Sequence, residues 1–252
     1  MLEAATRQAG ALALGFFHAR LKGWSKHDRT PVSEADMAVD RLLQSILCTH
    51  RPDYGWLSEE TADTGERLSR RRVWVVDPID GTRAFLKGRP WWCISAALVA
   101  DGEPVLGMIY APLLDEFYEA EAGGGAWLNR ARISVSPQAR LTGSRVLTGP
   151  EVFRPGRWAA PWPQMRIEQR NSFAYRLAQV AAGRFDALYA PSSKCEWDLA
   201  AGDLLLREAG GVLTAQGEQP LRYNAPSPVR RDLLGAGPAL HRRFLDRIGT
   251  GG

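Results

Sequence analysis

Apolar residues recur at helical spacing in two stretches near the start of the chain. The stretch 2–22 predicts a first helix, and the repeat between residues 39 and 47 predicts a second helix that ends near residue 49. A polar loop, 26–36, joins them, and its Ser33 and Asp36 resemble a capping box for the second helix. The chain is therefore expected to begin with two helices separated by a polar loop.

Short apolar runs bounded by turn residues predict strands in the middle of the chain. Residues 54–60 predict a short strand that ends in two acids, and residues 73–76 predict a buried strand. The segment between them, 61–72, has no apolar period and is expected to be a mobile surface loop. Further strands are predicted at 91–99, 103–112 and 115–129.

Helices and strands alternate in the second half. Helices are predicted near 172–182, 198–209 and 238–248, with strands at 185–190, 212–214 and 233–237. This order predicts a mixed α/β protein in which sheets and helices form layers. The pattern changes between residues 131 and 145, which suggests an N-terminal half, 1–135, and a C-terminal half, 136–252.

Composition narrows the classes of function. The 252 residues suffice for one large or two modest domains, and the net charge of +4 without a long basic run favours a small anionic ligand over a nucleic-acid polymer. The three cysteines form no C-x-x-C pair, so neither a disulfide framework nor a structural zinc site is predicted. No apolar stretch approaches ~20 residues, so a cytoplasmic protein without a membrane partner is expected.

Two aspartates, Asp77 and Asp80, stand directly after the predicted strand 73–76, in the stretch DPIDGT. Asp-Pro-x-Asp-Gly is also favourable turn chemistry, so a purely structural role is open on this stretch alone. Other acids also stand at the ends of apolar segments, namely Asp28, Glu59 with Glu60, and Asp198. Mg²⁺ prefers oxygen ligands, and a pair of such ions can clamp the attacking and leaving oxygens of a phosphoryl transfer. Converging carboxylates would hold these cations, which makes the acids candidate metal ligands.

Gly81 and Thr82 follow Asp80 and are predicted to begin a short helix that runs to about residue 87. Free backbone N–H groups and the positive end of the helix dipole favour an anion at such a position. Gly81 allows a close approach of the backbone, and the Thr82 hydroxyl can orient a water molecule. Gly81 and Thr82 are therefore the predicted phosphate contacts.

The stretch DPIDGT (77–82), followed by WDLAAGDLLLREAGG (197–211), is similar to the two signatures of the inositol monophosphatase superfamily. The resemblance covers most of the chain, from KHDRTPVSEAD (26–36) onward. It implies a layered α-β-α-β-α sandwich, usually a homodimer, that hydrolyses a small phosphorylated metabolite with Mg²⁺, two or three ions per site. Water would attack phosphorus directly, without a covalent enzyme intermediate.

By position, the resemblance also implies site residues. The implied metal ligands are the side chains of Glu59, Asp77, Asp80 and Asp198 and the backbone carbonyl of Ile79. Asp28 and Thr82 would activate the attacking water. Glu60 is expected to be a solvated neighbour of the ligand Glu59.

Three features favour the 3′(2′),5′-bisphosphate nucleotidase branch, with adenosine 3′,5′-bisphosphate as substrate. The loop around Asp28 is similar to the K-x-D-x-S/T-P-V pattern of that branch, and SKCEWD (193–198) resembles its SEWD. Arg176 stands where that branch has a basic residue, and Lys194 is a second candidate for substrate contact, although both suit a solvated surface as well. Inositol monophosphatase remains an alternative, weakened by Pro191 in place of a sugar-binding acid, as does histidinol-phosphate phosphatase, which DPIDGTRAF resembles.

Two rival interpretations come from other classes. Haloacid-dehalogenase phosphatases carry a D-x-D-G-T motif whose first aspartate is a nucleophile, but Asp77 and Asp80 are three positions apart and the downstream WDLAAG would be unexplained. A catalytically silent regulatory protein on the same fold is the second rival. It is disfavoured because no expected metal carboxylate is missing.

Overall fold

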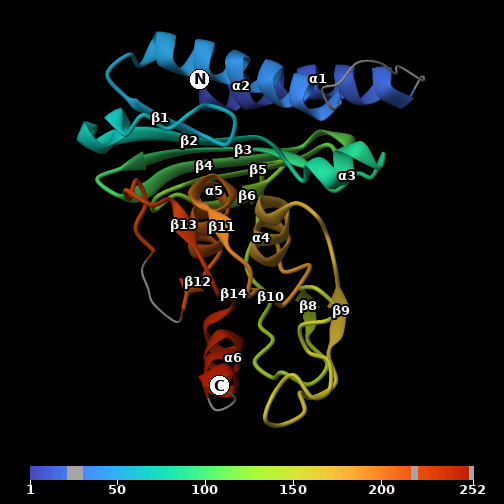
Figure 1. The fold of residues 1–252 in the computed structure, drawn as a ribbon. Helices are drawn as coiled ribbons and strands as arrows, with labels where there is room; N and C mark the ends of the chain where they lie inside the picture. Colours follow the sequence, from blue (N-terminus) through green and yellow to red (C-terminus); the bar gives the residue numbers. More distant parts are fainter. Residues whose placement is uncertain (22–30, 217–220, 250–252) are drawn as a thin grey trace.

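The structure is a computed structural model that describes residues 1–21, 31–216 and 221–249. Its elements are stacked in five layers, in the order helix, sheet, helix, sheet, helix (Figure 1). The predicted α-β-α-β-α sandwich is therefore confirmed. Among the helices of the described residues, none is both long and apolar enough to cross a membrane.

The outermost layer consists of α1 (Leu2–Leu21) and α2 (Pro31–His50), which lie side by side over one face of the first sheet (Figure 1). Both predicted helices are confirmed. The predicted capping box is wrong, because α2 already begins at Pro31 and Ser33 stands inside it. Asp36 is buried on the inner side of α2 instead of capping its start.

The first sheet has seven strands in sequence order. They are β1 (Gly55–Ser58), β2 (Arg72–Asp80), β3 (Cys93–Ala100), β4 (Glu103–Ala111), β5 (Glu116–Glu121), β6 (Gly125–Leu128) and β7 (Ala131–Arg132). β1 pairs in parallel with β2, and every later pair is antiparallel. The predicted strand 115–129 is thus two strands, β5 and β6. The turn between them includes Gly123, whose positive φ suits glycine.

The strand β2 is buried on both faces, which explains its unbroken apolar run. Alternate side chains of a strand point to opposite faces. Accordingly, Trp74 and Val76 join the core under α1 and α2, whereas Val73 and Val75 join the core between the two sheets. The side chains of this strand therefore contribute to both cores, the one under α1 and α2 and the one on the opposite face of the first sheet.

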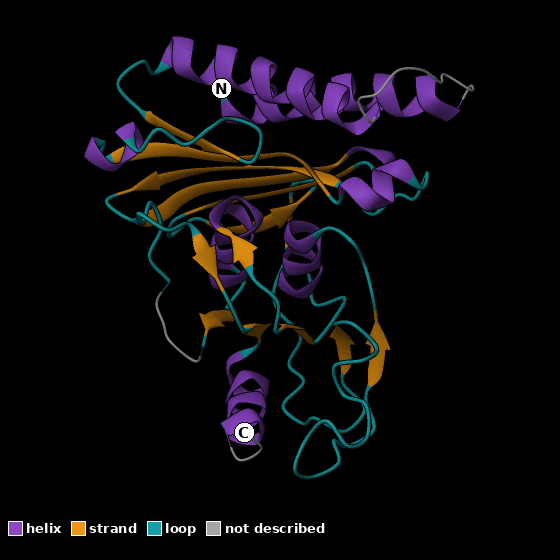
Figure 2. Cartoon of the chain, in the orientation of Figure 1, coloured by secondary structure: helices purple, strands orange, loops and turns teal. Residues whose placement is uncertain are grey.

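The middle layer consists of α4 (Phe173–Ala181) and α5 (Glu196–Glu208), packed between the two sheets (Figure 2). Gly107 of β4 is required for this packing, since a Cβ there would lie 2.9 Å from the carbonyl oxygen of Ala201 in α5. The backbone of α5 thus rests almost directly on the first sheet.

The second sheet has five strands in the order β12-β14-β10-β8-β9, and α6 (Pro238–Gly249) packs against it as the last layer. The strands are β8 (Arg145–Leu147), β9 (Arg166–Glu168), β10 (Ala187–Ala190), β12 (Val212–Ala215) and β14 (Leu233–Ala236). A separate two-stranded ribbon pairs β11 (Lys194–Cys195) with β13 (Val229–Arg230). The division into halves 1–135 and 136–252 remains a prediction, although the chain passes from the first sheet to the second between β7 and β8.

The segment 61–72 differs from the expected mobile loop. Arg67, in a short 3₁₀ helix (Glu66–Ser69), is only 2% exposed. Its guanidinium forms an ion pair with Asp63 at 2.7 Å and donates hydrogen bonds to the side chain of Asn224 and the carbonyl of Ala225. These long-range contacts anchor the segment, which no local hydrophobic period could indicate.

Candidate active site

A bulge in β2 brings the two predicted aspartates into one cleft. Asp77 pairs with Ser95 of β3 and Asp80 pairs with Cys93, so three steps along β2 match two steps along β3. In a regular strand, residues three apart point to opposite faces. The bulge adds one residue next to Pro78, which has no N–H to donate to the ladder. Because of this extra residue, Asp77 and Asp80 point to the same side of the strand. The prediction that β2 ends before Asp77 is wrong, because the strand runs through to Asp80.

Three carboxylates converge at the floor of this cleft. One oxygen from each of Asp77, Asp80 and Asp198 lies within 4.8 Å of the others. Asp198 stands in the first turn of α5, where its carboxylate accepts a hydrogen bond of 2.8 Å from the backbone N–H of Cys195. The sequence places these residues far apart, and only the packing of α5 onto the first sheet unites them.

Asp80 and Asp77 differ in their surroundings. The carboxylate of Asp80 accepts hydrogen bonds from the Ser172 hydroxyl, at 2.6 Å, and from the backbone N–H of Ala174. Ser172 is the N-cap of α4, so the start of this helix holds Asp80 in place. Asp77 is 0% exposed, and neither of its carboxylate oxygens has a donor among the described residues.

The cluster is electrostatically strained without a cation. Burial, followed by the charges of Asp80 and Glu59, raises the pKa of Asp77 well above its usual value. Burial and the charge of Asp198 raise the pKa of Glu59 to about 7, and burial with the charge of Asp80 raises that of Asp198 to about 6. Carboxyl groups repel one another in this way when no cation lies between them.

The residues present fit Mg²⁺. The donor set is made only of oxygen atoms, as a hard cation requires, and the buried oxygens of Asp77 accept no hydrogen bond from an N–H or hydroxyl group of the described residues. Glu59 lies at the mouth of the same cleft, with its carboxyl group beside that of Asp77. The four predicted acidic ligands are therefore brought together; their role as ligands and the number of ions stay predictions.

A further buried acid belongs to this cluster. Asp36 of α2 is 3% exposed, and burial together with the charges of Glu60 and Glu59 raises its pKa to about 8. Its Oδ2 has no hydrogen-bond partner among the described residues, and its charge also bears on Asp77. The sequence signal was available, because Asp36 falls on the apolar stripe of α2, where an acid is unusual. The predicted catalytic residue Asp28 lies outside the described residues.

The turn after Asp80 has the geometry that the motif suggested. Gly81 has a φ of 98°, and a Cβ there would lie 2.8 Å from the carbonyl oxygen of Trp91. Thr82 begins the five-residue helix α3 (Thr82–Leu86) and donates a hydrogen bond of 3.2 Å to the carbonyl oxygen of Ile79. The Thr82 oxygen therefore keeps its lone pairs for a water molecule, and the predicted ligand Ile79 lies directly beside it.

Both predicted substrate-binding cations line the cleft. Arg176 of α4 is 9% exposed, lies over the ring of Phe173 and donates a hydrogen bond to the carbonyl of Ser172. Burial lowers its pKa, and the charges of Asp80 and Asp198 oppose that shift. Lys194 of β11 lies over the same Phe173 ring, and its charge partly offsets the rise in the pKa of Asp198 that burial and Asp80 cause. Neither is a freely solvated surface cation.

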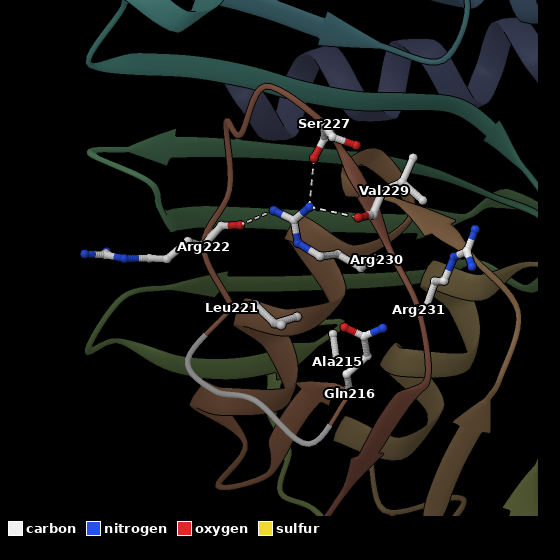
Figure 3. A pocket seen from close by; sticks show the side chains of 8 residues that line it. All are labelled: Ala215, Gln216, Leu221, Arg222, Ser227, Val229, Arg230 and Arg231. Carbon is white, nitrogen blue, oxygen red and sulfur yellow. Dashed lines mark hydrogen bonds between the residues drawn. The ribbon is translucent and has the colours of Figure 1, made fainter.

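The cleft has a volume of about 500 Å³ and contains the acidic floor, the Gly81 turn and these cations. A larger cavity of about 630 Å³ lies beside β13 and is lined by Arg222, Arg230 and Arg231 (Figure 3). There, Arg230 donates hydrogen bonds to backbone carbonyls and forms an ion pair of 2.8 Å with Glu196. The described residues that line this cavity include no acid, whereas the smaller cleft holds the acidic cluster, so the reaction chemistry is assigned to the smaller cleft.

The sequence pattern of the inositol monophosphatase family matches residues 1–246. The chain belongs to the inositol monophosphatase family. Members of this family are metal-dependent phosphatases that generally use Mg²⁺, and this chain is accordingly a phosphoric monoester hydrolase. The predicted family and enzyme class are confirmed.

Relatives of the chain carry more than one substrate name. An inositol-1-monophosphatase of Rhizobium meliloti is 39% identical over 191 residues, which are 73% of this chain and 71% of the relative. A histidinol-phosphatase of Chlorobaculum parvum is 34% identical and covers 97% of this chain and 93% of its own length. The solved structure of an inositol monophosphatase from Anabaena (Nostoc) has a TM-score of 0.80 at 29% identity, covering 99% of this chain and 94% of that one. These names do not support the predicted bisphosphate nucleotidase branch.

Proposed function

We propose that the chain hydrolyses the phosphate monoester of a small metabolite in the cleft above Asp77, with Mg²⁺ held by Glu59, Asp77, Asp80 and Asp198. The observation that carries this proposal is the buried carboxylate of Asp77, whose two oxygens have no donor among the described residues. A buried carboxylate without a proton donor is costly, and a cation removes that cost. The carbonyl of Ile79 is a further ligand in the proposal.

When bound, Mg²⁺ supplies positive charge to the phosphoryl oxygens and lowers the pKa of water. The remaining tasks fall to the chain itself. The N–H groups of Gly81 and Thr82 donate to the phosphate oxygens. The Thr82 hydroxyl oxygen accepts a hydrogen bond from the attacking water and so orients it, and the carboxylate of Asp28 accepts its proton. Ser172 and the start of α4 hold Asp80 so that its charge faces the cleft. Water attacks phosphorus, the ester bond breaks, and the leaving alkoxide takes a proton from solvent and departs as the alcohol.

The test is the release of inorganic phosphate from inositol 1-phosphate, histidinol phosphate and adenosine 3′,5′-bisphosphate, with Mg²⁺ and with EDTA. We expect turnover of at least one ester with Mg²⁺ and none with EDTA or in Asp77→Asn. Reaction in ¹⁸O-water separates direct attack from the covalent rival. In a single turnover the label should enter phosphate, whereas label in an aspartate side chain would establish a covalent intermediate.

A bisphosphate nucleotidase is the second candidate, and the positions of Arg176 and Lys194 favour it. Both cations line the cleft beside Asp198, where a second phosphate would gain charge-assisted hydrogen bonds. Lys194→Ala should then lower kcat/KM for adenosine 3′,5′-bisphosphate about tenfold to a hundredfold and leave inositol 1-phosphate little changed. Lys87→Ala, on the exposed end of α3, is a matched control. Equal losses for both substrates would remove this support for the nucleotidase.

The homodimer implied by the resemblance is also a proposal. Light scattering coupled to size-exclusion chromatography would give the mass of the particle directly. A mass near 28 kDa, that of a single chain of 27.8 kDa, would contradict the dimer.

A further inference from the structure

A smaller pocket of about 160 Å³, which the phosphate chemistry does not use, lies next to the active-site cleft and shares lining residues with it. Among the described residues, three line both spaces, namely Val152, Tyr189 and Pro191. Two others, Arg157 and Trp158, line the smaller pocket but not the cleft. The volume corresponds to roughly five water molecules at ~30 Å³ each, which is room for one small ring system. The two spaces are therefore neighbours with a common wall.

The wall of the small pocket is aromatic and firmly held. The indole N–H of Trp158 donates a hydrogen bond of 2.7 Å to the carbonyl of Val152, which fixes the plane of the ring. Trp158 packs edge-on against Trp162 with ring centres 5.1 Å apart, and Phe153 stacks on Tyr189 with centres 5.9 Å apart. Phe153, Trp158 and Trp162 lie on the loop 149–165, which contains no helix or strand (Figure 2), whereas Tyr189 lies on β10. Side-chain packing therefore maintains the shape of the loop.

The chemistry of this pocket suits a planar ring better than a polyol. Its lining offers flat apolar surface, one phenol and the guanidinium of Arg157, which is exposed and has no ion pair among the described residues. A sugar-like ring would leave most of its hydroxyl groups without partners against such a wall. An aromatic ring would stack on the wall, and the guanidinium would lie over its face.

We propose that this aromatic pocket is the subsite for the leaving group, and that it binds a planar heteroaromatic ring carried by the alcohol whose phosphate lies at Gly81 and Thr82. This inference rests on the proposed function and narrows its substrate class. Imidazole and purine share the chemistry that the pocket recognises, and a cyclic polyol lacks it. Trp158 and Arg157 then set the specificity, while the acidic floor and Thr82 carry out the reaction.

The experiment compares ring-bearing with ring-free esters. Trp158→Leu keeps apolar bulk but removes the flat ring. The ring-bearing substrates are histidinol phosphate and adenosine 3′,5′-bisphosphate, which separate imidazole from purine, and the ring-free ones are inositol 1-phosphate and glycerol 2-phosphate. We expect kcat/KM for at least one ring-bearing ester to fall roughly fivefold to a hundredfold, the range known for bases stacked on aromatic side chains, and ring-free esters to stay within about twofold.

Trp127→Leu is the matched control. Trp127 lies on β6, and its indole N–H also donates to a backbone carbonyl, that of Gly124 at 3.2 Å, but it does not line the cleft. This variant should leave kcat/KM unchanged for all four esters. Arg157→Gln serves as the second variant, since its exposed side chain can be replaced without disturbing the core. It should lower kcat/KM for the ring-bearing esters by roughly twofold to tenfold.

The outcomes separate the two proposals. If the wild type hydrolyses none of the four esters with Mg²⁺, the proposed function fails and the subsite fails with it. Suppose that the wild type hydrolyses them. The subsite alone is overturned if Trp158→Leu and Arg157→Gln lower kcat/KM equally for ring-bearing and ring-free esters, or if they lower kcat/KM for neither group. A wild type that accepts only ring-free esters overturns the subsite as well.

Discussion

Replacing Asp77 by asparagine should make the metal-free protein more stable while abolishing its activity. Asp77 is fully buried, and both of its oxygens lack a donor among the described residues. Asparagine has nearly the same shape but carries no charge, and its amide can donate to Glu59, whose carboxyl lies beside it. The same change removes a metal ligand of the proposed site, so stability and activity should move in opposite directions.

The size of the effect follows from the free energy needed to protonate the carboxyl group of Asp77 when the chain folds. In the unfolded chain Asp77 ionises near 3.8, and in the folded metal-free protein its pKa is raised well above that value. Each pH unit between the two values costs about 1.4 kcal/mol. From 3.8 to pH 7 the cost reaches up to about 4 kcal/mol, reduced where Glu59 shares the proton. We expect a gain of about 2–4 kcal/mol, which for a chain of this size corresponds to a rise of roughly 5–15 °C in Tm.

The dependence on pH and on Mg²⁺ provides a second readout. Because the folded pKa of Asp77 is raised, its contribution favours folding below about pH 4 and is lost as the pH rises. The wild type in EDTA should therefore lose stability between pH 4 and pH 8 more steeply than Asp77→Asn. Mg²⁺ binds the folded state and should raise the Tm of the wild type but not that of the variant.

The assay is thermal unfolding by calorimetry at pH 5, 6, 7 and 8, in EDTA and in Mg²⁺. Asp80→Asn is the matched control, because the carboxylate of Asp80 already accepts hydrogen bonds from Ser172 and Ala174. It should abolish activity without the large gain in stability. The reasoning is refuted if Asp77→Asn in EDTA melts at or below the wild type at pH 8, or if Mg²⁺ stabilises both proteins equally.

Three other substitutions test single residues of the fold and of the site. Gly107→Ala should lower the free energy of unfolding by about 1–3 kcal/mol in denaturant titrations, because the new Cβ would press on the backbone of Ala201; an unchanged midpoint would contradict the close packing of α5. Ser172→Ala removes the α4 cap and a hydrogen bond to Asp80. We therefore expect the free energy of unfolding to fall by about 1 kcal/mol and activation by Mg²⁺ to be weaker. Unchanged Mg²⁺ titrations of the activity would count against the role of Ser172 in holding Asp80. Asp36→Asn should flatten the stability of the metal-free protein between pH 4 and pH 8, because the folded pKa of about 8 makes the wild type less stable as the pH rises; parallel pH profiles would exclude this.

The elements that the sequence predicted are those with a strong local signal. The helices α1, α2 and α5 and the strand β2 carry apolar residues at a period that repeats over several turns or a continuous run, and such patterns depend on neighbours in the chain. The short strands β8, β9, β11 and β13 were missed, because two or three residues cannot display a period and these strands are defined by their partners. The sequence likewise predicts a mobile loop around Arg67, because the partners of this residue, Asn224 and Ala225, lie more than 150 residues further along the chain.

For the active site, the sequence by itself predicted residues that the fold brings into one cleft, since DPIDGT and WDLAAG are contiguous motifs. Tertiary structure decided how those residues are placed. The bulge that turns Asp77 and Asp80 to one side requires β3, the buried state of Asp36 requires α2 to pack on the first sheet, and the aromatic pocket requires Trp158 to meet Tyr189 of β10. Burial and proximity are properties of the folded chain, and they set the pKa values and the space for a substrate that no local pattern contains.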